Sequence, residues 1–287
     1  AAYTAVDKAE DEPSLCHKVN AAGTEILARL ARERDVKLLY ISTDYVFPGT
    51  GDTPHETNAL TAPHNVYGAS KLAGEEAVQQ HLDKYFIVRI SWVFGINGSN
   101  FVKTMLELAK THKSLSIVAD QIGSPTYTRD LAPLLADMLE SEKYGIYHAT
   151  NEGYCSWAKF AAEIFRQAGL DVNVTSVPSH MYPTKATRPK NSRLSKKSLD
   201  DAQKRFSQLK KSNVIANGSA DDKNITKLLS DASSAIGSGN FKDAQTAIGN
   251  AVSRMNAIES EYKNASAVAK KSLDDAAARQ KKLNASK

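Results

Sequence analysis

Apolar and polar positions follow two alternating periods along the first two hundred residues. Segments with apolar side chains at helical spacing are followed by short apolar runs rich in β-branched residues, which are typical of buried strands. The helical pattern covers residues 13–34, 67–82, 100–112, 128–141 and 156–169, and the strand pattern covers residues 36–43, 85–95, 115–120, 145–151 and 171–178. Strands that alternate with helices are typical of βαβ units. We therefore expect an α/β fold with a mostly parallel sheet and right-handed crossovers.

The pattern changes after residue 197. Apolar residues then keep helical spacing in two runs on either side of "GSGN" at 237–240, and an Ala- and Lys-rich stretch follows at 265–283. The first run holds Ile225, Leu228, Leu229 and Ile236, and the second holds Phe241, Ala244, Ile248, Ala251, Val252, Met255, Ile258 and Tyr262. This pattern predicts an all-α helical hairpin or small bundle.

Charge and composition change at the same place. Residues 1–197 hold 22 basic and 22 acidic residues, whereas residues 198–287 hold 15 and 10 and contain no Pro, Cys, His or Trp. We therefore expect two domains, 1–197 and 198–287. The heptapeptide "KKSLDDA" occurs at 196–202 and again at 270–276. We interpret the boundary as a join between unrelated sequences, and the alternative is a coincidence of helix-favouring residues.

Composition excludes several classes of protein. Hydrophobic residues make up 41% and charged residues 24% of the chain, as in soluble globular proteins. No apolar run approaches the roughly 18–20 residues of a membrane span, and the first residues have no signal-peptide pattern. The basic excess is too diffuse for a nucleic-acid surface, and the histidines have no metal-ligand spacing. We expect a cytoplasmic protein that has no metal site and binds neither nucleic acid nor membrane.

Tyr67 and Lys71 form the first candidate site. They lie four residues apart in a predicted helix, which puts both on one helix face. A phenol can give a proton to a developing alkoxide, and a nearby ammonium lowers the phenol's pKa of about 10. Ser42 and Thr43 end the strand 36–43, where a hydroxyl can bind the carbonyl oxygen. The spacing alone also fits an ordinary pair on a surface helix.

Four further motifs accompany this pair in a fixed order. They are "YISTDYVFPGTG", "RISWVFG", "DQIGSPTYTRDLA" and "RPKNSRLS". Together they resemble the extended short-chain dehydrogenase/reductases and, more narrowly, the dTDP-4-dehydrorhamnose reductase family. The resemblance covers residues 1 to about 197 and leaves residues 198–287 unassigned.

The resemblance implies an oxidoreductase that uses NADPH or NADH. Its reaction would reduce the 4-keto group of dTDP-4-dehydro-6-deoxy-L-mannose to give dTDP-L-rhamnose. Tyr67 would donate the proton, Lys71 would lower the pKa of Tyr67, and Thr43 would polarise the keto oxygen. The implied substrate-binding residues are Asp44, Tyr45, Trp92, Arg188, Asn191 and Ser192, and the implied cofactor-binding residues are Ala1, Ala2, Tyr3, Tyr67 and Lys71. Trp92 could instead be a core residue, Asp44 a turn cap and Arg188 a surface charge.

The Gly-rich dinucleotide fingerprint does not occur in these residues. Gly237 and Gly239 are the one tempting pair, but no strand precedes them and their flanks are helical. We therefore expect a truncated Rossmann-like domain in which the strand 36–43 is an exposed edge. The C-terminal helices, a second copy of the chain in a homodimer, or a separately supplied N-terminal fragment could cover this edge. Weaker cofactor binding and impaired activity follow from this interpretation. The alternative is a non-catalytic binding or scaffold protein, or an artificial fusion, that uses the helical tail to bind a partner.

Overall fold

The chain folds into two compact units, residues 1–196 and 197–287. The computed structural model describes residues 2–195, 206–237 and 241–285. The first unit is built on a parallel sheet with the strand order β1 (Leu38–Thr43), β2 (Tyr85–Ile90) and β7 (Gly145–His148). In the described residues β1 has a strand partner on one side only, so it is the edge of this sheet.

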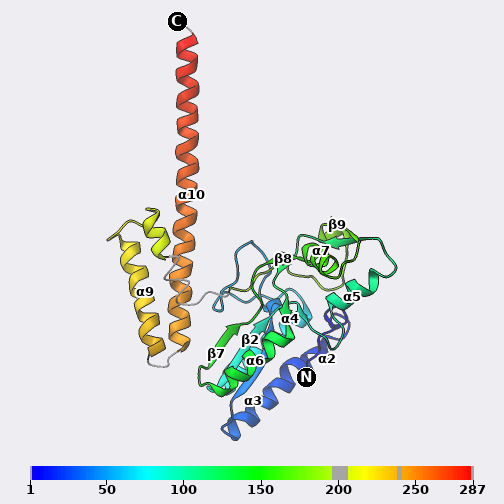
Figure 1. The fold of residues 1–287 in the computed structure, drawn as a ribbon. Coiled ribbons are helices and arrows are strands. Elements are labelled where there is room, and N and C mark those ends of the chain that lie inside the picture. Colours follow the sequence, from blue (N-terminus) through cyan, green and yellow to red (C-terminus); the bar gives the residue numbers. More distant parts are fainter. Residues whose placement is uncertain (1, 196–205, 238–240, 286–287) are drawn as a thin grey trace. The chain divides into compact units, whose positions relative to one another are not determined.

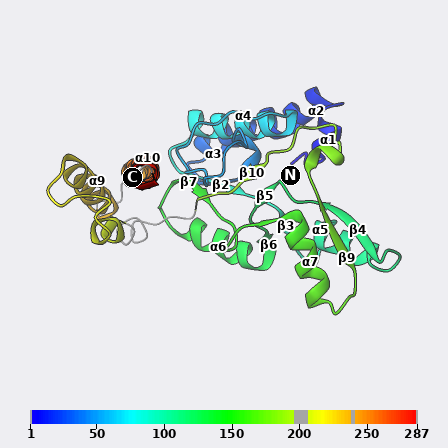
Figure 2. The ribbon, with the colours of Figure 1, turned by 90° about the horizontal axis from the view of Figure 1, so that it is seen from above.

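Helices cover both faces of this sheet, as Figure 2 shows. Side chains alternate between faces along a strand. Ile87 accordingly packs with residues of α3 (Gly23–Glu33) and α4 (Val66–His81), whereas Phe86 and Val88 pack with Leu131 of α6 (Thr128–Glu140). The expected α/β fold with a mostly parallel sheet is confirmed.

The start of α4 lies close to the end of β1. Asn65 caps the helix by accepting a hydrogen bond from the Gly68 amide at 2.7 Å. A Cβ atom at Gly68 would lie 2.4 Å from the carbonyl oxygen of Tyr45, in the short helix η2 (Asp44–Val46) that follows β1. Glycine at 68 therefore lets the first turn of α4 reach the end of the strand.

The remaining elements of this unit are short. They are α1 (Val6–Ala9), α2 (Pro13–His17), the π-helix η1 (Lys18–Ala22), β3 (Val93–Phe94), α5 (Phe101–Leu108), β4 (Ser114–Val118), β5 (Ile122–Gly123), β6 (Thr126–Tyr127), β8 (Cys155–Ser156), α7 (Trp157–Gln167), β9 (Asn173–Val177), η3 (Ser179–Met181) and β10 (Asn191–Ser192). They form three small sheets, β10–β5–β8, β3–β6 and β4–β9. Of these elements, α5, α7, β8 and β9 lie together beyond one end of the main sheet (Figure 1).

Two strand predictions need correction. The run 85–95 is not one strand, because β2 ends at Ile90 and Trp92 has a left-handed backbone with φ of 49°. The residues after it form β3, which pairs with β6 in another sheet. The predicted strand 115–120 corresponds to β4, which pairs with β9 and does not join the main sheet.

The second unit consists of helices. A helical turn over 206–211 is followed by α9 (Ala220–Gly237) and α10 (Phe241–Ala285) (Figure 1). Its core holds Phe206, Leu209, Ile215, Ile225, Leu229, Ala251, Val252, Met255 and Ile258. The stretch 265–283 is not a separate helix but continues α10, and Tyr262 is 49% exposed. The side chains of Ile236 and Phe241 lie outside the described residues. None of the described helices combines the length and apolar character needed to cross a membrane.

Candidate active site

A cavity of about 1030 Å³ opens along β1 in the first unit. This volume is at the upper end of ordinary ligand pockets. All six residues of β1 line it, together with Asp44, Tyr45, Tyr67 and Lys71 and with residues from the starts of α5 and α7. The cavity therefore brings together most of the residues singled out in the sequence.

Three side chains meet at the carboxyl end of β1. The Thr43 hydroxyl accepts a hydrogen bond from the Tyr45 amide at 3.3 Å and lies 3.0 Å from Oδ1 of Asp44, to which it donates. Tyr67 lines the same cavity, and the Thr43 hydroxyl acts to lower its pKa. The structure therefore brings Thr43, Asp44 and Tyr67 to one region of the cavity.

The pKa of Tyr67 differs from the sequence prediction. Burial raises it above its usual value, the Asp44 carboxylate raises it further, and the Thr43 hydrogen bond acts in the opposite direction. Lys71 does not counter these effects, because its ammonium donates to the Ile41 carbonyl at 2.7 Å and lies 3.9 Å from the centre of the Tyr40 ring. Burial lowers the pKa of Lys71 to about 8. The shared helix face was predicted correctly, but the direction of the pKa shift was wrong.

Two buried polar atoms beside the cavity have no partner in the described residues. They are Oγ of Ser42 and Oδ2 of Asp44, whose side chains are 2% and 3% exposed. Burial raises the pKa of the Asp44 carboxyl to about 6, and the neighbouring hydroxyls of Ser192 and Thr43 moderate the shift. Buried polar groups in native proteins nearly always have partners, so these atoms are suited to contact a ligand.

Aromatic side chains form part of the wall of the cavity. Trp92 stacks on Trp157 with ring centres 3.6 Å apart, and Phe101 lies 4.6 Å from Trp157. A Cβ atom at Gly123 would lie 2.8 Å from the Trp92 indole, so the absent side chain leaves room for that ring. Trp92 lines the cavity as predicted from the resemblance, while Trp157 and Phe101 were missed because their helical spacing gave only a core signal.

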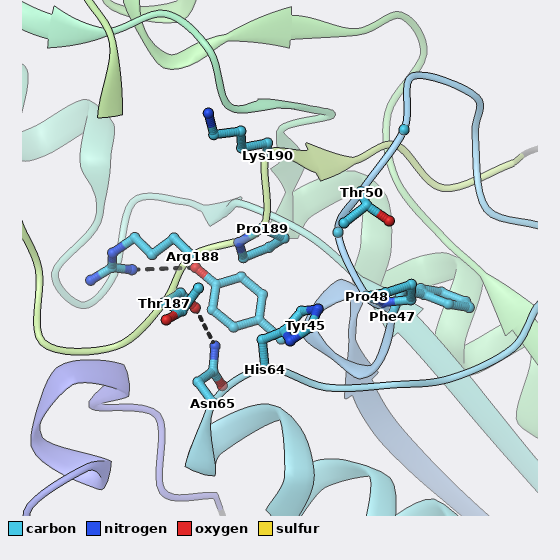
Figure 3. A pocket seen from close by; sticks show the side chains of 12 residues that line it. Tyr45, Phe47, Pro48, Thr50, His64, Asn65, Thr187, Arg188, Pro189 and Lys190 are labelled. Carbon is cyan, nitrogen blue, oxygen red and sulfur yellow. Dashed lines mark hydrogen bonds between the residues drawn. The ribbon is translucent and has the colours of Figure 1, made fainter. Parts of the chain in front are cut away.

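Arg188 also lines the cavity. Its guanidinium donates to Oδ2 of Asp7 at 2.5 Å. It also donates to the hydroxyl of Tyr45 at 3.3 Å, as Figure 3 shows. Tyr45 and Arg188 also line a second cavity of about 440 Å³, in which the Asn65 amide donates to the Thr187 carbonyl (Figure 3). No pattern in the sequence indicated the role of Asp7.

Other predicted residues lie elsewhere. Asn191 donates to the carbonyls of Thr53 and Thr50 at 2.8 and 3.2 Å and is 1% exposed. Neither Asn191 nor Ser192 lines these two cavities, so the expectation that they close over a ligand differs from the structure. Instead, Asn191 bonds to the loop that contains Thr50 and Thr53, and Ser192 acts on the pKa of Asp44.

Of the cofactor-binding residues predicted at the start of the chain, only some lie at the cavity in the described residues. Ala2 lines the cavity, whereas Ala1 lies outside the described residues. The main chain of Tyr3 bonds to the Asn20 side chain, and its hydroxyl donates to Glu12 at 2.8 Å. Tyr3 is therefore engaged away from the cavity.

A buried ion pair supports α4 behind the site. Glu75, one turn after Lys71, accepts two hydrogen bonds from Arg89 of β2, at 2.9 and 2.7 Å. Arg89 also donates to the Thr57 carbonyl and lies over the Phe47 ring. The sequence analysis missed both residues, although Glu75 shares the helix face of Tyr67 and Lys71. In the described parts of the chain, no three His, Cys, Asp or Glu side chains are grouped closely enough to hold a metal ion.

Comparisons with known proteins agree with this geometry. The family described as "RmlD substrate binding domain" matches residues 1–212. The dTDP-4-dehydrorhamnose reductase of Salmonella typhimurium is 46% identical over 205 residues, which cover 68% of this chain and 69% of that protein. A crystal structure of the Bacillus anthracis dTDP-4-dehydrorhamnose reductase in complex with NADP is 46% identical, has a TM-score of 0.68, and matches over 70% of this chain and 71% of that one. The Clostridium acetobutylicum enzyme of the same name is 45% identical with a TM-score of 0.67, over 68% and 69% of the two chains.

Proposed function

The chain belongs to the RmlD substrate-binding-domain family, that of the dTDP-4-dehydrorhamnose reductases, and from this premise we propose that it reduces a 4-keto nucleotide sugar. The substrate is dTDP-4-dehydro-6-deoxy-L-mannose and the product is dTDP-L-rhamnose. The observation that carries the proposal is that Thr43, Tyr67 and Lys71 line one cavity of ligand size at the end of β1.

Tyr67 acts as the proton donor in this proposal. Its raised pKa keeps the phenol protonated near neutral pH, so a proton is available for the oxygen that becomes an alkoxide. Thr43 donates a hydrogen bond to the same oxygen, which stabilises the developing negative charge. NADPH, when bound, supplies the hydride. Tyr67 and Lys71 hold its ribose. The unpartnered Ser42 hydroxyl and Ala2 line the same cavity, which supports this position for the cofactor.

The substrate lies between the polar end of β1 and the aromatic wall. Asp44 and Tyr45 contact the sugar, and Trp92 packs against it. Arg188 binds the diphosphate, because a guanidinium can donate to two oxygens at once. Asn191 and Ser192 contribute through the loop and through Asp44.

The exposed edge of β1 supports a proposal about assembly and location. Ile41 on this strand and Ile26, Leu27 and Leu30 on α3 are between 42% and 59% exposed, so we propose that a second copy or another polypeptide covers this edge. The two free cysteines, Cys16 and Cys155, support a cytoplasmic location, because thiols persist in a reducing compartment.

The test is NADPH oxidation with the 4-keto nucleotide sugar, followed by identification of the product. We expect dTDP-L-rhamnose to form in step with NADPH loss. Weaker cofactor binding stays a prediction, so a separate NADPH titration must establish saturation first. Saturated protein that leaves the sugar unreduced would contradict the proposal.

A further inference from the structure

Asp44 is a buried carboxyl group at the centre of the site. Its side chain is 3% exposed, its Oδ1 accepts from Thr43, and its Oδ2 has no partner in the described residues. Burying a carboxylate costs several kcal/mol unless it is paired, and no cation is bonded to Asp44 in the described residues. A position beside the sugar alone does not explain why this group is covered.

The Thr43 hydroxyl connects Asp44 to Tyr67. It donates to Oδ1 of Asp44 at 3.0 Å, it lines the same cavity as Tyr67, and it acts to lower the pKa of Tyr67. A threonine hydroxyl has one donor and two acceptor positions, so it can accept from one neighbour while it donates to the other. We propose that Asp44 holds the proton that reloads Tyr67 through the hydroxyl of Thr43. This inference rests on the proposed reduction.

The transfer balances without any further reactant. When the Tyr67 O–H bond breaks, its proton forms a new O–H bond at O4 of the sugar and leaves a phenolate. The Asp44 carboxyl then gives its proton to Oγ of Thr43, while the original hydroxyl proton of Thr43 moves to the phenolate. Tyr67 and Thr43 are restored, and Asp44 is left as a carboxylate that regains a proton from water in the cavity.

The groups around Asp44 fit a proton store. Tyr45 from η2 and Tyr67 from α4 are the titratable groups affected by its charge, and the Ser192 hydroxyl of β10 acts to lower its pKa. Arg188 lies beyond Tyr45 and is paired with Asp7. Lys71 is the rival source of the proton, but its ammonium is bonded to the Ile41 carbonyl. Burial raises the pKa of Asp44 to about 6, so a fraction of it is protonated near neutral pH.

The first test needs no substrate or cofactor. The protein is labelled with ¹³C at the aspartate carboxyl carbons, and the Asp44 signal, assigned with Asp44→Asn, is titrated by NMR. We expect a midpoint near pH 6 that rises in Thr43→Val, because the hydroxyl that stabilises the carboxylate is lost. Thr43→Ser keeps the hydroxyl and should leave the midpoint in place. A midpoint at the ordinary value, or one that ignores Thr43→Val, would overturn the proposal.

The second test is turnover as a function of pH. Asp44→Asn should slow turnover by about 10–100-fold and abolish its dependence on pH near 6, and formate should restore part of the rate. Asp120→Asn, which removes a carboxylate bonded to Ser179 away from the cavity, is the matched control and should keep the native profile. An unchanged pH profile in Asp44→Asn would overturn the proposal. If the native protein itself fails to reduce the sugar, the proposed function fails, and the NMR titration alone decides whether Asp44 and Thr43 are coupled.

Discussion

The two units of the chain bury different kinds of residues. In the described parts of the chain, all but one of the buried polar or charged side chains belong to the first unit, and Asp222 is the exception in the helical unit. The first unit has several small apolar clusters, whereas the helical unit has one. A site for proton chemistry requires polar groups in the interior, whereas the described helices of the second unit pack mainly through apolar side chains, with ion pairs such as Arg254–Asp221 less buried.

The largest expected effect concerns the chemistry of the first unit. Tyr67→Phe removes only the hydroxyl, and we expect turnover to fall by about 10²–10⁴-fold, because proton donation in the transition state is lost. Steady-state NADPH oxidation measures it. Tyr85→Phe, a half-buried tyrosine of β2 in an apolar cluster, is the matched control and should keep native turnover.

The next effect concerns the buried ion pair. Glu75→Ala leaves Arg89 charged and unpaired in the interior, and we expect the free energy of unfolding of the first unit to fall by about 3–5 kcal/mol. Denaturant unfolding measures this, with the helical unit's transition unchanged. Asp35→Ala breaks the exposed pair with Lys84 and should cost less than about 1 kcal/mol. Equal losses in both variants would contradict the comparison.

Asp44 should make the first unit less stable as pH rises. Its folded pKa of about 6 lies above the value of about 3.9 in an unfolded chain, so the unfolded chain loses this proton first, and stability falls between about pH 4 and 6. Asp44→Asn should therefore raise the free energy of unfolding by about 1–3 kcal/mol at pH 7 and leave it unchanged below pH 4. Denaturant unfolding at several pH values checks this. A loss of stability at pH 7 would show that the carboxylate is stabilising.

The core of the helical unit allows a comparison within one helix. Val252 is fully buried in α10 and Val268 is 67% exposed on the same helix. We expect Val252→Ala to lower the unfolding free energy of this unit by about 1.5–3 kcal/mol and Val268→Ala by less than about 0.5 kcal/mol. Thermal unfolding followed by circular dichroism distinguishes them.

Asp222 should affect the stability of the helical unit in the direction opposite to that of Asp44 in the first unit. Its hydrogen bond with Lys210 lowers its pKa, and the Gly218 amide acts in the same direction. This carboxylate therefore stabilises the helical unit above the unfolded pKa, and the stabilisation is lost as pH falls through the folded value. Asp222→Asn should destabilise the unit at pH 7, where Asp44→Asn stabilises the other unit. The same unfolding measurements test both signs.

Sequence patterns predicted what depends on spacing within one element. The helix containing Tyr67 and Lys71 was expected at 67–82 and lies at Val66–His81, with the two residues on one face. The sequence did not show where the Lys71 ammonium points, because its acceptor, Ile41, belongs to a strand thirty residues away. For the same reason the Asp7–Arg188 pair, 181 residues apart, needed the structure.

The strand predictions were wrong where pairing with a distant strand, and not the local sequence, determines the structure. The apolar run 115–120 indicated a strand, but its partner β9 lies far along the chain and removes it from the main sheet. The run 85–95 looked continuous because the sequence carries no sign that Trp92 adopts a left-handed backbone. The space opposite Gly123 that accommodates its indole is visible only once the two segments are folded.

The length of α10 has a consequence for how its backbone opens. Its 45 residues would extend about 67 Å at 1.5 Å per residue, yet the described core contacts end at Ile258. The described residues from Ser260 to Val268 are mostly exposed, so there the helical state depends mainly on intrinsic propensity, which is a weak force in water. Amide hydrogen exchange should therefore be slow beside Val252 and faster beside Val268 of the same helix.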